Sequence, residues 1–151
     1  VAPTNLGEVF NSQFNPAKAH IYQDGEWSYI NTNDTIKDLN PVAIDPNDKN
    51  HMAFACMASG GIMEVQSKQI KGFYTNANSP LIGYNGTDDI RITGVNFDKN
   101  SNLWASITLG KKCVCVKKPN NTWVLLDFEQ FVVQPTISKI IFDKQDQAWI
   151  V

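Results

Sequence analysis

Residues 95–107 show the alternation of hydrophobic and polar positions that characterises this chain. Val95 and Phe97 alternate with polar neighbours, a run of turn-forming residues follows, and Trp104 resumes the apolar pattern. Alternation with a period of two is typical of a half-buried strand, and a cluster of Asp, Asn and Ser is typical of a tight turn. This stretch therefore predicts two strands joined by a polar turn.

The same pattern recurs in residues 140–151. There Asp143 is followed six residues later by Trp149, just as Asp98 is followed six residues later by Trp104. Self-similarity of this kind indicates a structural repeat rather than two unrelated hairpins.

Residues 42–54 form a third, looser copy of the pattern. Asp45 occupies the place of the other two aspartates, and Met52 and Phe54 stand where Trp is expected. We predict that the turn of this copy is longer than the others by about two residues.

Further strands complete the repeating unit. Asp24-Gly25 lies between two segments rich in aromatic and β-branched residues and predicts a hairpin over 19–30, because Gly accepts the positive φ that such a turn requires. Trp27, Phe73 and Trp123 occupy matching fourth strands, 46 and 50 residues apart. The other expected strands are 42–45, 51–58, 62–66, 70–75, 90–98, 102–109, 112–117 and 122–128.

A period of about 45 to 50 residues, with four short antiparallel strands in each unit, predicts an all-β fold and a β-propeller segment. A single four-stranded sheet hides one face at most, so neighbouring sheets are expected to pack face to face. The expected segments are a partial blade at 1–35 with C-terminal strands, complete blades at 36–78 and 79–131, and a partial blade at 132–151 with first strands.

This arrangement predicts a piece excised from a longer protein, cut at equivalent points of the repeat. Its sheet edges and apolar faces would otherwise be exposed, and exposed edges favour pairing with other chains. We therefore expect the segment to pack with the rest of a propeller or with copies of itself.

Composition and charge exclude several classes of function. The 151 residues are 42% hydrophobic and 19% charged with a formal charge of −2, which is a globular composition. No basic cluster is large enough for a nucleic-acid groove, which requires a concentrated positive field. No apolar run approaches the roughly 20 residues of a membrane span, and no signal peptide opens the sequence.

The three cysteines, Cys56, Cys113 and Cys115, do not form a disulfide framework, because their number is odd and their spacing wide. Cys113 and Cys115 are two positions apart on an expected strand, so we predict that both point to one face and are buried. A metal site would have to add His20 or His51 as further ligands, and no metal or cofactor is expected.

The spacing of Asp98, Asn100 and Asn102 resembles the start of a calcium loop. The sixth position is Leu103 instead of Gly, and the twelfth is Leu109 instead of an acidic residue. We predict instead that Asp and Asn side chains cap their own turn.

No catalytic constellation is found, so the chain is predicted not to be an enzyme. Asp88 and Asp89 are adjacent and cannot flank a substrate as a carboxylate pair does. Arg91 is the only arginine, so the fork of donors that a sialidase site requires is missing. His51 is expected at a turn and exposed, and His20 is expected to be structural.

Aromatic side chains are expected to fill the core, and loops are expected to carry any binding. Asn-rich connectors at 31–40 and 76–85 are the candidates for a carbohydrate or protein ligand, because loops on a rigid scaffold usually hold binding residues. Three glycosylation-like sequons at Asn33, Asn85 and Asn120 carry little weight in an Asn-rich chain. The aromatic residues assigned to the core are Trp27, Trp104, Trp123, Trp149, Phe97 and Phe142.

Residues 98–106, with an Asp, a polar turn, Asn-Leu-Trp and a strand of small residues, resemble the two-component regulator propeller repeat. The chain is also similar to the propeller component of type IX secretion in Bacteroidetes, through residues 1–3, 24–27, 44–46 and 74–81. Where the family has a turn glycine, this chain has Ser101 or Asp146.

The resemblance implies a non-catalytic recognition or scaffold module of a bacterial cell-envelope protein. That protein would be either a periplasmic sensor of a hybrid two-component system or a type IX secretion component, located in the periplasm or at the outer cell surface. The alternative is the propeller portion of a carbohydrate-active enzyme whose catalytic residues lie outside this segment.

Overall fold

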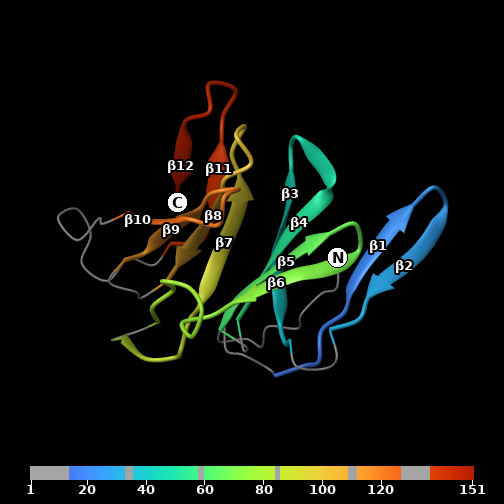
Figure 1. The fold of residues 1–151 in the computed structure, drawn as a ribbon, viewed down its shortest axis with the longest axis horizontal. Helices are drawn as coiled ribbons and strands as arrows, with labels where there is room; N and C mark the ends of the chain where they lie inside the picture. The colour runs from blue at the N-terminus through green and yellow to red at the C-terminus, as the bar shows by residue number, and fades with distance from the viewer. Residues whose placement is uncertain (1–13, 33–35, 58–59, 84–85, 109–111, 127–136) are drawn as a thin grey trace.

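The fold is known from a computed structural model that describes residues 14–32, 36–57, 60–83, 86–108, 112–126 and 137–151. Its strands are all antiparallel and form two four-stranded and two two-stranded sheets. Figure 1 shows the sheets following one another across the molecule in chain order, as an open fan. The chain is therefore all-β with a propeller-like arrangement of sheets.

Each four-stranded sheet is a simple meander, in which neighbours in sequence are neighbours in space. The first pair of strands is β1 (Ala19–Gln23) and β2 (Glu26–Ile30). The next sheet consists of β3 (Leu39–Asp45), β4 (Asp48–Cys56), β5 (Gly61–Gln66) and β6 (Gln69–Tyr74). The third consists of β7 (Ile92–Phe97), β8 (Leu103–Ile107), β9 (Val114–Lys117) and β10 (Trp123–Leu126). The last pair is β11 (Ile140–Phe142) and β12 (Ala148–Ile150).

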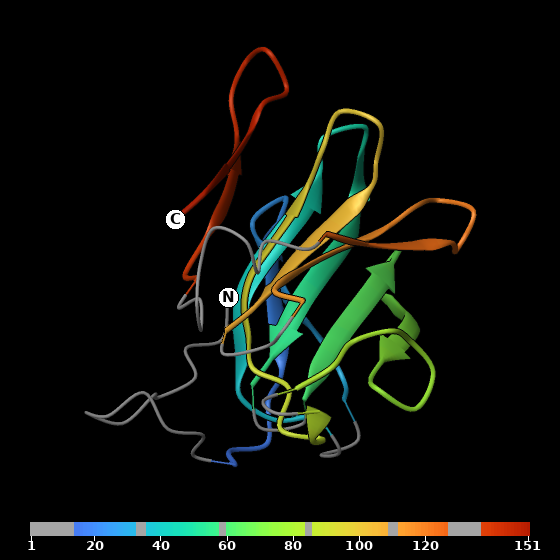
Figure 2. The ribbon, with the colours of Figure 1, turned by 90° about the vertical axis from the view of Figure 1, so that its left-hand side faces the viewer.

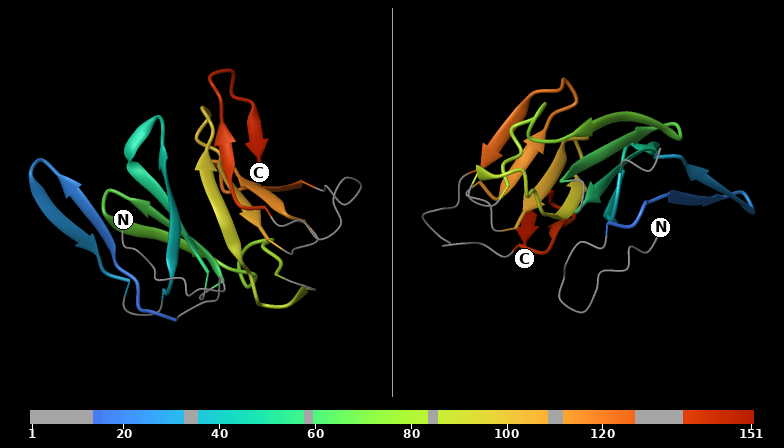
Figure 3. Two further views of the ribbon diagram at one scale, coloured as in Figure 1. Left: turned by 180° about the vertical axis from the view of Figure 1, so that it is seen from behind. Right: turned by 90° about the horizontal axis from the view of Figure 1, so that it is seen from below.

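The first strands of successive units lie next to one another. β3 packs beside β7, and β7 packs beside β11. The turns that follow these three strands lie at one end of the molecule, as Figures 1 and 2 show. The view from below in Figure 3 shows the same succession of sheets around the inner strands. Repeated units are thus stacked in one orientation, so that equivalent turns become neighbours.

Three apolar clusters hold the sheets together, one at each junction between neighbours. Ile30 and Phe54 belong to the cluster between β1–β2 and the second sheet. Ile62 and Phe97 belong to the cluster between the two four-stranded sheets. Val114 and Ile140 belong to the cluster beneath β11–β12. Burying each such side chain contributes about 1.5–3 kcal/mol, so these junctions supply the main driving force for stacking.

The predicted hairpins are confirmed, and local turn chemistry explains them. Asp24 and Gly25 both have positive φ, 54° and 86°, and join β1 to β2 as expected for an Asp-Gly turn. Ser101 and Asp146 also adopt positive φ, 60° and 64°, at the position where the resembling family has glycine. These residues accept the left-handed conformation at a steric cost.

The first copy of the repeat differs from its prediction. β3 ends at Asp45 and β4 begins at Asp48, so the turn is shorter than in the second copy, where β7 ends at Phe97 and β8 begins at Leu103. The prediction of a longer turn was wrong. The reason is that β4 begins at Asp48, which pairs with Asp45, although residues 48–50 are polar.

Two of the aromatic residues predicted for the core are on the surface. Trp27 is 69% exposed and Trp149 is 57% exposed. Each lies in an end pair of strands, β1–β2 or β11–β12, whose outer face no other described strand covers. Phe97 is buried, and Trp104, Trp123 and Phe142 are partly buried against the clusters.

Each sheet falls within one of the four segments expected from the sequence, but the boundaries at 35/36, 78/79 and 131/132 stay a prediction. The described part of the chain contains no helix long and apolar enough to cross a membrane.

Candidate functional site

The Asp of each repeat organises its own turn. Asp98 Oδ1 accepts hydrogen bonds from the backbone N–H of Asn100 and Asn102, both at 2.9 Å. Its Oδ2 accepts one from Trp104 Nε1 at 2.9 Å, which explains the spacing of six residues. Burial opposes ionisation of Asp98, but the donors from Asn102 and Trp104 hold its pKa below the ordinary value. Asp98 therefore acts as the predicted turn cap.

Asp143 makes the same set of contacts in the last copy. It accepts from the backbone N–H of Gln145 and Gln147 at 3.0 and 2.9 Å, and from Trp149 Nε1 at 2.9 Å. The hydrogen bond from Trp149 is the main cause of its lowered pKa. The Asp-to-Trp hydrogen bond is thus the structural basis of the repeat.

In the first copy a histidine takes the place of the tryptophan. His51 is six residues after Asp45, and its Nδ1 lies 2.9 Å from Asp45 Oδ2. The prediction that His51 is exposed at a turn was wrong: it lies within β4 and is 9% exposed. The sequence contains the signal, because counting six residues from each Asp reaches Trp104, Trp149 and His51.

His51 connects Asp45 to a buried glutamate on β5. Its Nε2 lies 2.6 Å from Glu64 Oε1, and Glu64 is only 1% exposed. Lys71 Nζ also donates to Oε1, at 3.0 Å, and Tyr74 donates to Oε2 at 2.6 Å. Lys117 Nζ of the neighbouring sheet lies 3.1 Å from Oε2. Each carboxylate oxygen of Glu64 therefore faces two donors.

We call Asp45, His51, Glu64, Lys71, Tyr74 and Lys117 the buried ionic cluster. Burial by itself would raise the pKa of Glu64, but the donors Tyr74, His51 and Lys71 lower it to about 2. Burial and the adjacent Glu64 raise the pKa of Tyr74. The cluster thus holds Glu64 ionised, and both ring nitrogens of His51 lie against carboxylate oxygens.

This geometry determines what His51 can do chemically. A general base needs a free ring nitrogen to accept a proton from a nucleophile or water. Both nitrogens of His51 are engaged by carboxylate oxygens, at 2.9 and 2.6 Å. The cluster is therefore an ion-paired cross-link between two sheets.

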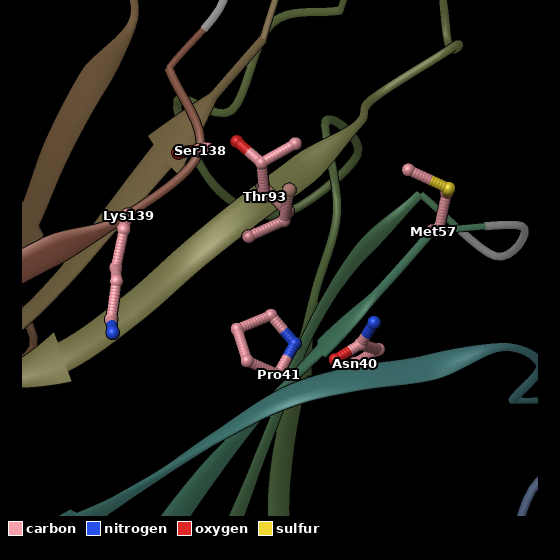
Figure 4. Close-up of a pocket in the computed structure, with 7 residues that line it drawn as sticks. Asn40, Pro41, Met57, Thr93, Ser138 and Lys139 are labelled. Carbon is pink, nitrogen blue, oxygen red and sulfur yellow. The ribbon is translucent and has the colours of Figure 1, made fainter. Parts of the chain in front are cut away.

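A pocket of about 280 Å³ lies where the inner strands of three units meet, as Figure 4 shows. Asn40 and Pro41 of β3 form one side, Thr93 of β7 another, and Ser138 and Lys139 lie on the segment that leads into β11. Its full lining is Asn40, Pro41, Met57, Ile92, Thr93, Ser138 and Lys139. Mostly apolar walls with a few convergent polar groups are typical of ligand sites.

The Asn-rich connectors contribute less than the sequence suggests. Asn40, at the end of the connector 31–40, lines the inner pocket, while 33–35 lie outside the described residues. In the second connector, Asn78 bonds its own loop through Thr75 N–H and the Phe73 carbonyl, at 2.9 Å each. Asn78 therefore stabilises the loop.

The other candidates noted in the sequence have structural partners. Asp89 pairs with Arg91 at 2.7 Å, and Asp88 accepts from Asn76. Asn120 accepts from Thr122 within a turn. Of the remaining sequons, Asn33 and Asn85 lie outside the described residues.

The cysteines and His20 differ partly from expectation. All three cysteines are buried, as predicted for Cys113 and Cys115, and burial raises the pKa of Cys115 to about 12. Cys113 and Cys115 belong to different apolar clusters, so the prediction of one shared face was wrong. The reason is that β9 begins at Val114, after Cys113. His20 lies exposed on β1 beside Tyr29, with ring centroids 6.3 Å apart.

Successive antiparallel meanders that pack through repeated Asp-capped turns define the class of this chain as a β-propeller-like protein. Models of known protein families give no match, and neither do the curated protein sequences.

Two solved structures are similar in fold. One is PorZ, a bacterial surface component of the type IX secretion system of Porphyromonas gingivalis, with a TM-score of 0.76 at 16% sequence identity. The match covers 88% of this chain and 19% of PorZ, so this chain spans about a fifth of that protein. The other is a luciferin-regenerating enzyme, with a TM-score of 0.51 at 18% identity, covering 79% of this chain and 37% of that one.

Proposed function

We propose that this chain is a non-catalytic propeller segment that serves as a recognition or scaffold module of a bacterial cell-envelope protein. The observation that carries the proposal is the likeness in fold to PorZ over 88% of the chain. That protein is a surface component of type IX secretion, which favours a secretion scaffold over the periplasmic sensor of a two-component system. The location would then be the periplasm or the outer surface.

The internal contacts support a rigid scaffold. His51, Glu64 and Lys117 tie two sheets together through buried polar contacts, and each carboxylate oxygen of Glu64 faces two donors. Binding would take place at loops and at the inner pocket, since rigid sheets hold such positions in fixed geometry. The ligand would be a protein or a carbohydrate.

Neighbouring units would cover the outer faces of the end sheets. Tyr22, Trp27 and Tyr29 are exposed on β1–β2, and Ile141 and Trp149 are exposed on β11–β12. We propose that the remainder of a propeller, or further copies of this chain, pack on these faces, because large exposed apolar patches usually mark interaction sites.

The proposal is tested by deleting the gene in its native bacterium and measuring export of proteins that depend on type IX secretion. We expect export to fail, and complementation with the intact gene to restore it. Complementation with Lys139→Gln, which changes the inner pocket, is expected to restore less export than the surface control Lys144→Gln. Normal export in the deletion strain would contradict the secretion scaffold.

A separate assay tests whether this chain is itself catalytic. The purified protein is incubated with a panel of polysaccharides, and released reducing ends are measured. We expect no release above the buffer control. Hydrolysis that is lost in the Glu64→Gln variant, while that variant stays folded by circular dichroism, would overturn the non-catalytic proposal.

A further inference from the structure

A second pocket, of about 160 Å³, opens beside the buried ionic cluster. It lies between the second and third sheets, where β4, β5 and β6 face β8 and β9. Its lining includes three lysines, Lys71, Lys117 and Lys118, together with Glu64. We refer to it as the lysine pocket.

The charges around the lysine pocket do not balance within its wall. Three lysine ammonium groups share a single lining carboxylate, that of Glu64. Both Glu64 oxygens are already occupied by two donors each, one of which is Lys117. Among the residues that the structure describes, no carboxylate pairs with the ammonium of Lys118. The pocket therefore presents excess positive charge to a ligand.

Lys117 strengthens this field because it is nearly inaccessible to water. Its side chain is 3% exposed, with Nζ 3.1 Å from Glu64 and 5.1 Å from the ring centroid of Tyr74. Water screens a buried charge less than a surface charge. The Lys71 side chain is 41% exposed although its ammonium pairs with Glu64, and Lys118 is exposed, so a ligand can reach both from solvent.

The pocket lining also contains apolar residues, and one of them, Leu103, is the cross-strand partner of Lys117. Phe97 and Leu103 are buried there, and Pro119 lies exposed at the rim. A fully hydrated inorganic ion gains nothing from such residues, whereas a carbon skeleton does. The volume of about 160 Å³ is below the roughly 300–1,000 Å³ of sites for drug-sized ligands. It therefore fits a small organic acid or one unit of a larger ligand.

We propose that the lysine pocket binds a small organic carboxylate, with the carboxylate near Lys71 and Lys118 and the carbon skeleton against Leu103 and Pro119. The source would be either a free organic acid or a uronic acid unit of a polysaccharide, since both present the same group. Lysine ammonium groups recognise a carboxylate as point charges, without the two-point fork that arginine offers. This site is independent of whether the chain serves type IX secretion.

The test is a titration of the ¹⁵N-labelled protein, followed by amide chemical shifts. Sodium glucuronate is expected to shift the amides of Ser101, Lys117 and Lys118 with millimolar affinity, and glucose at the same concentration is not. An oligogalacturonate that binds about tenfold more tightly than glucuronate would indicate a polysaccharide source, and equal binding of both would indicate a free acid. Absence of shifts with all three compounds would overturn the proposal.

Two substitutions locate the binding. Lys118→Gln and Lys71→Gln are each expected to weaken glucuronate binding by roughly tenfold, the effect of losing one charge-assisted hydrogen bond. Lys144→Gln, an exposed lysine on the β11–β12 turn, is the matched control and is expected to bind as the parent does. Lys118 forms no ion pair in the described structure, so its replacement keeps the fold. Equal binding by all three variants would overturn the proposal.

Inorganic phosphate distinguishes the ligand chemistry. Because it cannot use the apolar residues, phosphate is expected to bind more weakly than glucuronate at equal ionic strength. The assignment of a carboxylate would be overturned if phosphate bound more tightly than glucuronate and if Lys118→Gln weakened that phosphate binding.

Discussion

The residue six positions after the repeat Asp performs two tasks. Trp104 caps Asp98 at 2.9 Å and also packs on Phe142 of the next sheet, with ring centroids 5.4 Å apart. His51 likewise pairs with its Asp and lies 4.8 Å from the ring of Phe97. One side chain thus fixes the turn within a unit and the contact to the following unit.

Trp104→Phe is expected to separate these two tasks. The ring contact to Phe142 is kept, while the hydrogen bond to Asp98 is lost. We expect the free energy of unfolding to fall by roughly 1.5–3 kcal/mol, because the acceptor is a charged group. Urea denaturation measures the change, and Trp123→Phe, whose ring contacts Tyr74, serves as the control for losing an indole. Equal losses in both variants would contradict a capping role.

Acid is expected to destabilise the protein through Glu64. Its pKa is about 2 in the folded protein and 4.5 without the fold, so its stabilising contribution is complete above pH 4.5. That contribution is lost progressively as the pH falls from about 4.5 to about 2. Thermal unfolding measured across this range should show a steeper decline for the parent than for Glu64→Gln.

The Glu64→Gln variant should also be less stable at pH 7. It leaves the buried Lys117 without its carboxylate, and breaking such a pair costs about 3–5 kcal/mol. Glu26→Gln, at an exposed position on β2, is the control and should change little. An unchanged midpoint in Glu64→Gln at neutral pH would contradict the importance of the cluster.

At the scale of elements, the turns of successive units are joined to one another. Ser101 Oγ donates to Asp45 Oδ1 at 2.9 Å, and Asn47 Nδ2 donates to the Lys99 carbonyl at 2.8 Å. Lys99 N–H in turn donates to Asp146 Oδ1 at 3.1 Å. The turns after β3, β7 and β11 therefore form a continuous hydrogen-bonded row at one end of the molecule.

Substitutions at Ser101 separate backbone strain from this contact. Ser101→Ala and Ser101→Gly both remove the hydroxyl that binds Asp45, but only glycine adopts the φ of 60° without steric cost. We expect the Gly variant to be more stable than the Ala variant by about 1 kcal/mol. Denaturant midpoints of the two purified variants measure the difference, and equal midpoints would contradict the strain argument.

The elements were predictable because their causes are local. Asp24-Gly25, the Asp98 turn and the Asp143 turn each contain the residues that determine their conformation, so the sequence displays them directly. The buried ionic cluster was not predicted, because Glu64 and Lys117 meet only when two sheets pack. The available signals were a glutamate inside an apolar strand and the spacing from Asp45 to His51.

At the scale of the whole molecule, the ends of the fan present aromatic side chains. Trp27 and Tyr22 lie side by side on the outer face of β1–β2, with ring centroids 5.1 Å apart. Trp149 is exposed at the opposite end. No described strand covers these two outer faces, so the arrangement of sheets is open at both ends.

The purified protein is therefore expected to self-associate. Sedimentation velocity should show average mass rising with concentration, because burial of apolar surface favours contact between copies. Trp27→Thr removes the most exposed aromatic group and should weaken association, whereas Glu26→Gln on the same strand should not. A constant monomer mass over a hundredfold concentration range, roughly 3 kcal/mol of association energy, would contradict this expectation.

The ionic cluster has a consequence for how such arrays evolve. His51 pairs in register with Gln66 and Trp104 with Val116, so Glu64 corresponds to Val114 in the following unit. The junction between the two four-stranded sheets therefore contains an ion pair beside its apolar cluster, whereas the corresponding position at the next junction is the apolar Val114. A gene duplication that shuffled these units would bring Lys117 against hydrocarbon, at a prohibitive electrostatic penalty. The positions of the buried charges thus restrict which unit can pack next to which.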